Sequence, residues 1–364
     1  MLLKTSGTNY IPLEESFGGE IGIFYFVPLV AHYFQNNALI SVSFFLTGLV
    51  VCGCVSMAAT LCCITQNWVL RLYSIGMTVA MGYVAWVIGD VYIAYFTAIA
   101  LLPWLFVLSE KKILVMSCYF FSVGLCAYCI DFIRSYAALP LLAGCLWWLL
   151  LIIGYQKKMY KHAFLYFCFL GFGWWIASFH IEQVLYQRDT FLVDQGYIKN
   201  SNNKIQHTFW HNVYMGFGFI TNDKDLNFSD ACSAAKVASL DRTAPCYSKE
   251  YEKLLCNEVV KLCIYSPHYV LRVMFAKLGV FIYLFLLFAN IGIIAAWYYP
   301  KPWYIECFYL VLFLTSSLAG FATIPVGTYT LGFMTVAYLY GMHSLLYAFC
   351  MRKKFLVSVS DACS

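Results

Sequence analysis

Charged side chains stand close to long apolar runs at three places in this sequence. The carboxylates are Glu14, Glu15, Glu20, Asp90 and Asp131, and Arg134 follows the last of them by three residues. A charge at a membrane border is costly unless it is paired or useful, so each is a candidate site residue. In glycosyl transfer a carboxylate removes the acceptor's proton while a cation stabilises the leaving phosphate. The alternative is loop solvation, with an Asp131–Arg134 ion pair at helical spacing.

A second group of candidates is a histidine pair with aromatic neighbours. His207 and His211 stand at i and i+4, which is metal-ligand spacing on a helix, although the glutamate of a zinc-hydrolase motif is absent. We leave three interpretations open: a metal site, a contact to substrate or a lipid headgroup, and structural packing. Trp210 and Tyr214 accompany the histidines as sugar contacts or as packing residues.

The sequence disfavours several other chemistries. It contains no Walker loop, dinucleotide fingerprint or nucleophile elbow. Its net charge of +5 is spread between apolar runs, so a nucleic-acid partner is not supported. No inverted repeat is detected, which makes a secondary transporter a third choice only.

The composition predicts that these residues are held by membrane helices. Hydrophobic residues make up 62% of the 364 residues and charged residues 11%, against about 25% charged in a soluble domain. Long unbroken apolar runs favour helices over a β-barrel of short alternating strands. We predict an all-α polytopic membrane protein with about nine transmembrane helices, at 38–64, 68–88, 91–108, 112–130, 135–155, 162–181, 278–299, 303–324 and 327–350.

Basic residues predict the orientation of these spans. They gather on alternate connections, at Lys111–Lys112, Lys157–Lys161, Lys301 and Arg352–Lys354. The positive-inside rule makes those connections cytoplasmic and places every candidate site residue on the external side. The predicted parts are an external segment (1–37), helices one to six (38–181), a loop domain (182–276), helices seven to nine (277–351) and a cytoplasmic tail (352–364).

The N-terminal segment is expected to be external and partly helical. Residues 21–34 are too short to span a membrane and contain Pro28, so we predict a helix at the membrane interface. The sequence has no signal-peptide pattern. A segment of this length outside the membrane suggests that a preceding span is missing from the sequence.

The external loop is predicted to be a small, mostly helical domain. It holds ten of the 18 acidic residues, between Glu182 and Glu258. A helix is expected to begin after a Ser248 cap and to end before Pro267. A second helix from about Tyr269 would carry Arg272 and Lys277 at the membrane border, where their side chains can reach water.

Four of the 16 cysteines, Cys232, Cys246, Cys256 and Cys263, lie in this loop. Cys256 and Cys263 are seven residues apart, or about 10 Å along a helix, so they cannot pair with each other. We expect one disulfide that joins Cys232 or Cys246 to Cys256 or Cys263, or that joins Cys232 to Cys246.

Several blocks resemble bacterial membrane proteins related to the GT-C glycosyltransferases. The blocks are HTFWHNVYMGFGFITND, SDACSAAKV, SKEYEKLLCNEVVKL, SPHYVLRVMFAKLGV, IRSYAALPLL and IPVGTYTLGFMTVAYLYG. The resemblance implies a GT-C fold, a polyprenyl-phosphate sugar donor and chemistry on the external face. It also implies a catalytic acid in the first external loop, where Glu14 or Glu15 stands, and a second acid in the next loop, where Asp90 stands.

We therefore predict a glycosyltransferase in the inner (plasma) membrane of a bacterium, with a cytoplasmic C-terminus. It would move a sugar from a polyprenyl-phosphate carrier to an envelope glycan, lipid or protein, in contact with membrane lipid. Glu14 or Glu15 would be the general base, Asp90 would orient the acceptor or a divalent metal ion, and Arg134 would pair with the donor phosphate. The alternative is a non-catalytic scaffold or carrier-binding subunit of an envelope assembly complex.

Overall fold

The computed structural model describes residues 2–4, 10–12, 21–34, 37–88, 90–108, 112–155, 160–194 and 208–362. Near the N-terminus, β1 (Leu2–Lys4) and β2 (Tyr10–Pro12) pair in antiparallel fashion with Leu3 opposite Ile11. Every other regular element in the described residues is a helix.

The first half of the chain forms helices α1 to α8. Their bounds are α1 (Ile21–Ala31), η1 (His32–Phe34), α2 (Ala38–Ile64), α3 (Trp68–Ile88), α4 (Ile93–Ile99), α5 (Trp104–Leu108), α6 (Ile113–Ile133), α7 (Leu139–Tyr155) and α8 (Tyr160–Asp194). The second half forms α9 (Phe209–Gly216), η3 (Phe217–Phe219), α10 (Asp230–Leu240), α11 (Lys249–Tyr265), α12 (Pro267–Ala289), α13 (Ile291–Tyr298), α14 (Trp303–Ala322) and α15 (Gly327–Ala362).

Seven of the described helices are long and apolar enough to cross a membrane. They are α2, α3, α6, α8, α12, α14 and α15. The prediction of a helical membrane protein is confirmed at this level. Two segments predicted as full spans, 91–108 and 135–155, form shorter apolar helices instead.

The segment 91–108 does not form one long helix, because the helix is interrupted between α4, which ends at Ile99, and α5, which begins at Trp104, directly after Pro103. Backbone carbonyls released by a break inside a membrane need new partners. Ser56 donates its hydroxyl to the carbonyl of Ala100 at 2.9 Å, and Tyr119 donates to that of Leu101 at 2.9 Å. Hydropathy does not detect this break, because the residues that stabilise it lie on other helices.

The predicted span 278–299 also has different bounds. It begins earlier, at Pro267, and ends at Asn290, whose φ of 40° separates α12 from α13. The short α13 then packs closely on α15, since a Cβ added at Gly292 would lie 2.2 Å from the carbonyl oxygen of Gly341. Glycine at 292 thus permits a backbone contact that a larger residue would prevent.

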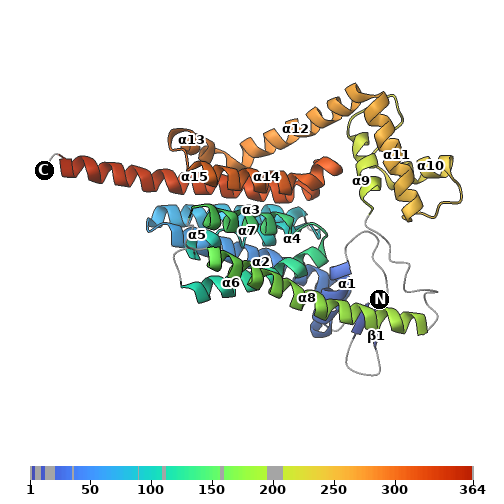
Figure 1. Ribbon diagram of the computed structural model, residues 1–364, viewed down its shortest axis with the longest axis horizontal. Helices are drawn as coiled ribbons and strands as arrows, with labels where there is room; N and C mark the ends of the chain where they lie inside the picture. The colour runs from blue at the N-terminus through green and yellow to red at the C-terminus, as the bar shows by residue number, and fades with distance from the viewer. Residues whose placement is uncertain are drawn as a thin grey trace.

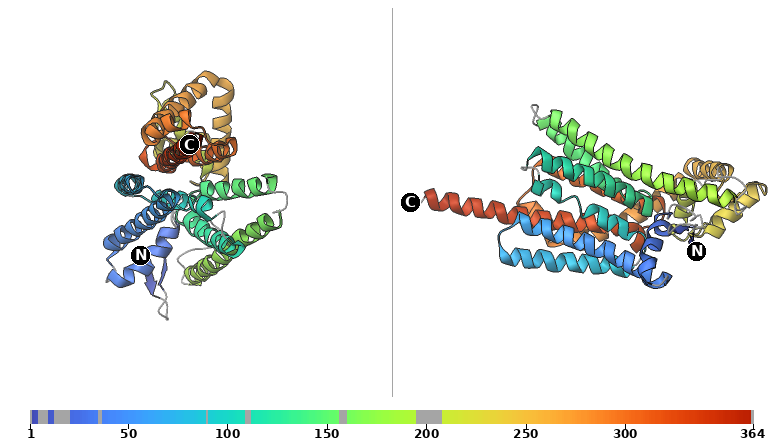
Figure 2. Two further views of the ribbon diagram at one scale, coloured as in Figure 1. Left: turned by 90° about the vertical axis from the view of Figure 1, so that its left-hand side faces the viewer. Right: turned by 90° about the horizontal axis from the view of Figure 1, so that it is seen from below.

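The helices form two groups that pack on each other. Viewed end-on, α12 to α15 lie in one group and α1 to α8 in the other (Figure 2). Helix α14 packs on α7, and α15 packs on α3 and α4. The shared core between the groups includes Ile99, Leu141, Phe308, Leu312 and Leu331, all nearly inaccessible.

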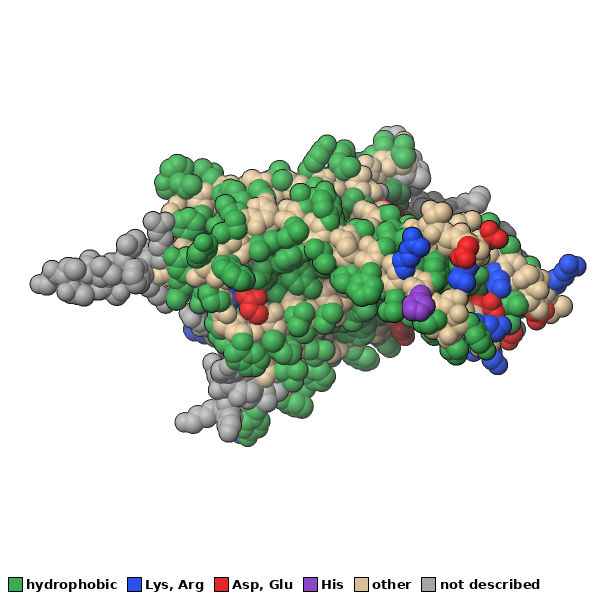
Figure 3. Space-filling view, turned by 90° about the horizontal axis from the view of Figure 1, so that it is seen from above, with side chains coloured by type: hydrophobic (Ala, Val, Ile, Leu, Met, Phe, Trp, Pro, Cys, Tyr) green, Lys and Arg blue, Asp and Glu red, His purple; other side chains and the backbone are tan. Residues whose placement is uncertain are grey.

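The two ends of the molecule differ in chemistry. Helices α9 to α11 form a separate body, here called the α9–α11 domain (residues 208–266), at the same end as the N-terminus and opposite the C-terminus (Figures 1 and 2). Charged side chains gather on this domain, whereas apolar side chains dominate the face of the helical bundle (Figure 3). The predicted loop domain (182–276) extends beyond this body, because its first residues belong to α8, which ends at Asp194, and its last residues belong to α12, which begins at Pro267.

Local predictions for this domain are confirmed in its second half. The Ser248 hydroxyl caps α11 by accepting the Tyr251 amide at 3.2 Å, and the next helix begins at Pro267. Outside this domain, the helix predicted in the N-terminal segment is also present as α1, with Pro28 inside it. The domain has its own core, built on Tyr214, Phe217, Tyr251 and Leu255 among others.

The predicted disulfide is wrong. Cys232, Cys246, Cys256 and Cys263 are all free thiols, and Cys246 and Cys263 are exposed. Helix α11 is continuous through its two cysteines, as expected. The Cys232 thiol donates instead to the carbonyl of Asp225 at 3.7 Å, and the domain packs around its own aromatic core.

Lys277 also differs from its prediction. Its side chain is buried, with 1% exposed, and donates to the carbonyls of Phe321 at 2.8 Å and Thr323 at 2.5 Å. These carbonyls lie at the C-terminal end of α14, where a cation is favoured by the helix dipole. Lys277 therefore caps α14 and does not extend towards water, whereas Arg272 is exposed.

Candidate functional site

The first part of the candidate site is the turn that follows α6. Arg134 ends this helix, and its amide donates to the Ile130 carbonyl at 3.0 Å. The Asp131 carboxylate accepts the amide of Tyr136 at 2.7 Å, and Tyr136 has a φ of 68°. A positive φ is uncommon for a bulky residue, so the Asp131 bond helps to hold the turn in this conformation. The turn fixes the direction in which Arg134 leaves the helix.

Arg134 reaches the turn before α4. Its guanidinium donates to the hydroxyl of Tyr92 and also lies over the Tyr92 ring, with Cζ 4.3 Å from the ring centroid. This is a combined hydrogen bond and cation–π contact. In the same turn the Asp90 carboxylate accepts the Val91 amide at 2.6 Å, and the Asp90 carbonyl accepts the Ile93 amide at 3.0 Å. Two turns that carry predicted site residues are thus joined directly.

Two further segments meet the same place. The ring of Tyr329, at the start of α15, makes an edge contact with Tyr92 at 4.9 Å between centroids. Phe228 of the α9–α11 domain in turn contacts Tyr329 at 6.1 Å. The Arg134 cluster, defined as Asp90, Tyr92, Asp131, Arg134 and Tyr329, therefore lies where the helical bundle meets the α9–α11 domain.

Helix α1 packs beside this cluster. A Cβ added at Gly22 would lie 2.5 Å from the Cα of Ile133, the residue before Arg134. Only glycine allows the two backbones to approach this closely. The chain that precedes α1 carries Glu14, Glu15 and Glu20, and all three lie outside the described residues.

The electrostatics of the cluster keep Tyr92 protonated. Burial raises the pKa of the Tyr92 phenol well above its usual value, although the nearby Arg134 acts in the opposite direction. A protonated phenol can accept a hydrogen bond from Arg134 and donate its own proton to an oxygen. Asp90, Asp131 and Arg134 are half-buried, so a ligand at the surface can reach them.

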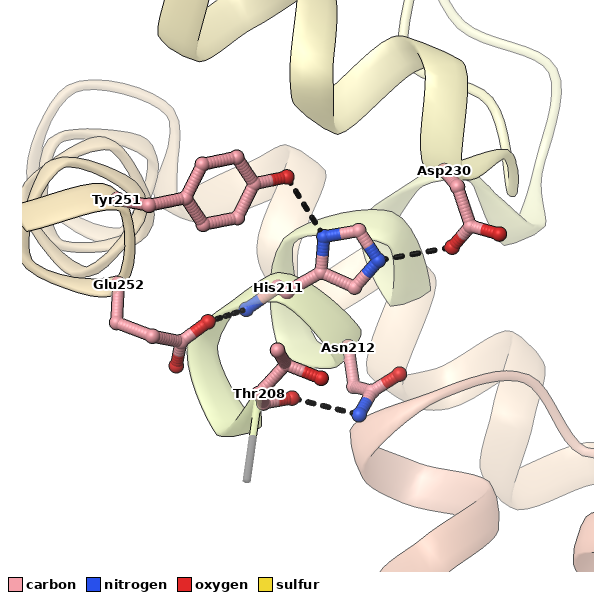
Figure 4. A network of polar contacts seen from close by, with 6 residues as sticks. All are labelled: Thr208, His211, Asn212, Asp230, Tyr251 and Glu252. Atoms are coloured by element: carbon pink, nitrogen blue, oxygen red, sulfur yellow. Dashed lines mark hydrogen bonds and ion pairs between the residues drawn. The ribbon is translucent and has the colours of Figure 1, made fainter. Parts of the chain in front are cut away.

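The other predicted residues gather elsewhere, in the centre of the α9–α11 domain (Figure 4). His211 is buried, and its Nδ1 lies 2.8 Å from the Tyr251 hydroxyl while its Nε2 lies 2.8 Å from Asp230 Oδ1. Burial raises the pKa of Tyr251, so its phenol donates to Nδ1. Nε2–H then donates to the Asp230 carboxylate, so both ring nitrogens of His211 have a partner. His211 links α9, α10 and α11.

A carboxylate from α11 caps α9 in the same network. Glu252 accepts the amides of Trp210 at 2.7 Å and His211 at 3.1 Å. These amides have no partner within the helix, so a carboxylate at this point satisfies them and complements the helix dipole. Tyr214, one turn further on, is buried in the domain core, where burial raises its pKa to about 12.

The structure brings together three of the nine predicted site residues. Asp90, Asp131 and Arg134 belong to the Arg134 cluster, while Trp210, His211 and Tyr214 form part of the α9–α11 core. His207 lies outside the described residues. In the part of the chain that the structure describes, no group of three or more His, Cys, Asp or Glu side chains could hold a metal ion. We therefore derive no step that uses a metal.

Sequence reasoning missed Tyr92 and Tyr329. Tyr92 follows the candidate acid Asp90 by two residues, and Tyr329 lies within the block IPVGTYTLGFMTVAYLYG. The available signal was a tyrosine two residues after a candidate acid, which is weak because the chain contains 29 tyrosines. Comparisons of the chain with protein-family models, with curated proteins and with solved structures found no match.

Proposed function

We propose that the protein is a membrane glycosyltransferase of GT-C type that takes its sugar from a polyprenyl-phosphate carrier. The observation that carries the proposal is the contact between Arg134 and Tyr92, which joins two turns predicted to be external. A guanidinium has a fork of N–H donors that matches a phosphate, and a neighbouring protonated phenol adds another donor. A phosphate held there would lie beside Asp90 and Asp131.

In the proposed reaction the carboxylate of Glu14 or Glu15 takes the proton of an acceptor hydroxyl. The hydroxyl oxygen forms a bond to the anomeric carbon of the sugar, and the bond between that carbon and the carrier phosphate oxygen breaks. Arg134 stabilises the negative charge that develops on the leaving polyprenyl phosphate. Asp90 orients the acceptor.

The assignment is tested with purified protein in lipid vesicles that contain a polyprenyl-phosphate sugar. Arg134→Ala should lower release of the polyprenyl phosphate by about 10²-fold, the usual effect of removing a group that stabilises developing charge. Arg272→Ala is the matched control, because Arg272 is an exposed arginine at the start of α12. Turnover by Arg134→Ala at the wild-type rate would disprove the role of Arg134, and unchanged turnover by the double variant Glu14→Gln, Glu15→Gln would remove the base assignment.

A second function is favoured by the surface of the α9–α11 domain. This domain carries the charged part of the surface (Figure 3) and also exposes Ile264 and Tyr265, with 64% and 79% exposed, at the end of α11. We therefore keep as the alternative a non-catalytic subunit of an envelope assembly complex. Co-purification of a stoichiometric protein partner without any bound polyprenyl lipid would favour this alternative over the enzyme.

A further inference from the structure

A groove opens between α12, α14 and α15 on the side of the bundle away from α1 to α8. Its volume is about 390 Å³. Its walls are almost wholly apolar, with a single charged group, and include Phe281, Ile282, Phe285, Phe313, Phe333 and Glu306. Ile282 is 52% exposed, so this wall faces the surroundings of the bundle. The groove lies on helices long and apolar enough to span a membrane.

The groove follows the length of α14. Its lining extends from Glu306, in the first turn of α14, to Phe321 near the end of that helix. Fifteen residues of helix correspond to about 22 Å. The hydrocarbon core of a bilayer is about 30 Å thick, and one acyl chain normally extends through half of it. The groove is thus long enough for a whole acyl chain that enters from the Glu306 end.

The charged group at that end is an acid whose basic partner is hidden. Glu306 Oε1 lies 3.0 Å from Lys301 Nζ, and the Glu306 side chain is 37% exposed while that of Lys301 is 0% exposed. Lys301 also donates to the Ser344 hydroxyl at 2.6 Å and lies 4.0 Å from the centre of the Tyr340 ring. The ion pair therefore presents its carboxylate to the groove and encloses its ammonium group within the protein.

We propose that this groove binds one acyl chain of a phospholipid whose headgroup is a primary amine, such as phosphatidylethanolamine. The headgroup ammonium would donate to the Glu306 carboxylate, which can accept several hydrogen bonds. Lipid chains are as apolar as the groove, so transfer of the chain from the bilayer contributes little selectivity. The charge-assisted bond at Glu306 therefore selects the lipid.

The charge at Glu306 also argues against other headgroups. An anionic lipid such as phosphatidylglycerol would place its phosphate beside the Glu306 carboxylate, while Lys301, the basic partner of Glu306, is enclosed and does not line the groove. Phosphatidylcholine carries a positive charge but no N–H group, so it can attract Glu306 without donating to it. The site thus predicts an order of affinity in which the primary amine comes first.

The proposal is tested by native mass spectrometry of the full chain, titrated with lipids that have identical chains and different headgroups. The wild-type protein should bind phosphatidylethanolamine about tenfold more tightly than phosphatidylglycerol, as expected for one hydrogen bond to a charged group. Phosphatidylcholine should fall between them. Equal affinity for all three lipids would overturn the proposal.

Variants at Glu306 test the headgroup contact separately from the chain contact. Glu306→Gln should reduce the preference to within about twofold. If this variant fails to fold because Lys301 loses its partner, the double variant Lys301→Met, Glu306→Gln makes the same test without a buried charge. A preference that survives either change would refute the role of Glu306.

Ile282→Trp should fill the groove and weaken binding of every lipid severalfold. Leu287→Trp is the matched control, because Leu287 is also 52% exposed on α12 but does not line the groove. Equal lipid binding by the two tryptophan variants would overturn the groove as the site. Tighter binding of a long isoprenoid lipid that Ile282→Trp abolishes would also overturn it, by assigning the groove to a different occupant.

Discussion

The Arg134 cluster and the His211 network are both polar, but they are built in different ways. The His211 network joins three helices within residues 208–266, and its central side chains, His211 and Tyr251, are 3% and 1% exposed. The Arg134 cluster joins surface turns and half-buried charges from parts of the chain that are far apart in sequence. Spacing in the sequence therefore predicts a local framework such as the His211 network more easily than a site assembled from distant segments.

This contrast indicates which of the two regions can contact a substrate. Both ring nitrogens of His211 have partners inside the domain. Arg134 instead stands at the junction between the α9–α11 domain and the bundle, beside α1 and the start of α15. The comparison favours a structural role for His211 and a ligand-binding role for Arg134, and three changes test it.

The largest effect on stability is expected from His211→Ala. This change removes a buried ring and leaves the Tyr251 hydroxyl, also buried, without its partner. Such a loss should destabilise the α9–α11 domain by about 2–3 kcal/mol. Hydrogen exchange of α9, α10 and α11 in vesicles, measured by mass spectrometry, reports it as faster exchange in these three helices.

His268→Ala is the control for this experiment, since His268 is an exposed histidine at the start of α12. It should leave exchange in the domain unchanged. If His211→Ala also leaves exchange unchanged, the network does not hold the domain together and the contrast between the two regions fails.

The second test changes the pH and concerns the ion pairs of Glu258 in the same domain. Burial alone would raise the pKa of Glu258, but hydrogen bonds and charges from Lys236 and Lys261 outweigh it and lower the pKa below its ordinary value of 4.5. Lys236 lies 2.8 Å and Lys261 2.7 Å from the carboxylate. A lowered pKa means that the bond contributes stability above pH 4.5, and that this contribution is lost as the pH falls through the lowered value.

We expect Glu258→Gln to cost about 1.5 kcal/mol at neutral pH and to remove part of the acid sensitivity of α10 and α11. Hydrogen exchange at pH 7 and over a series of pH values below 4.5 measures both effects. Glu250→Gln, which alters an exposed acid in the first turn of α11, is the control. Equal acid sensitivity in Glu258→Gln and the wild-type protein would show that these ion pairs do not stabilise the domain.

The sequence was informative where a structure depends on nearby residues. The Ser248 cap acts on an amide three residues away, and Pro267 marks a helix boundary by its own covalent geometry. The long apolar runs likewise indicate most of the membrane helices. Each of these features is set within one or two helical turns, so a pattern of residue types is sufficient to predict it.

Features that depend on distant residues were not predictable in this way. Arg134 and Tyr92 are 42 positions apart, and nothing in either block specifies the other. The break at Pro103 is tolerated because Ser56 and Tyr119, on two other helices, satisfy the released carbonyls. The sequence predicts Lys277 at a membrane border, and only the position of α14 beside it shows that Lys277 caps that helix. In each case the deciding partner is supplied by the tertiary structure.

The smallest stability effect is expected for the residue with the largest proposed functional effect. Arg134→Ala removes the cation–π contact and the hydrogen bond to Tyr92 at a half-buried surface turn, and these two contacts together contribute about 1 kcal/mol. Tyr92 keeps its ring contacts with Tyr95 and Tyr329, so the turn before α4 should stay ordered. The thermal midpoint of the purified protein in vesicles should therefore fall only slightly, while release of polyprenyl phosphate falls by about 10²-fold. If the midpoint falls as far as in His211→Ala and turnover falls in proportion, Arg134 is a structural residue like His211 and the contrast between the two regions is lost.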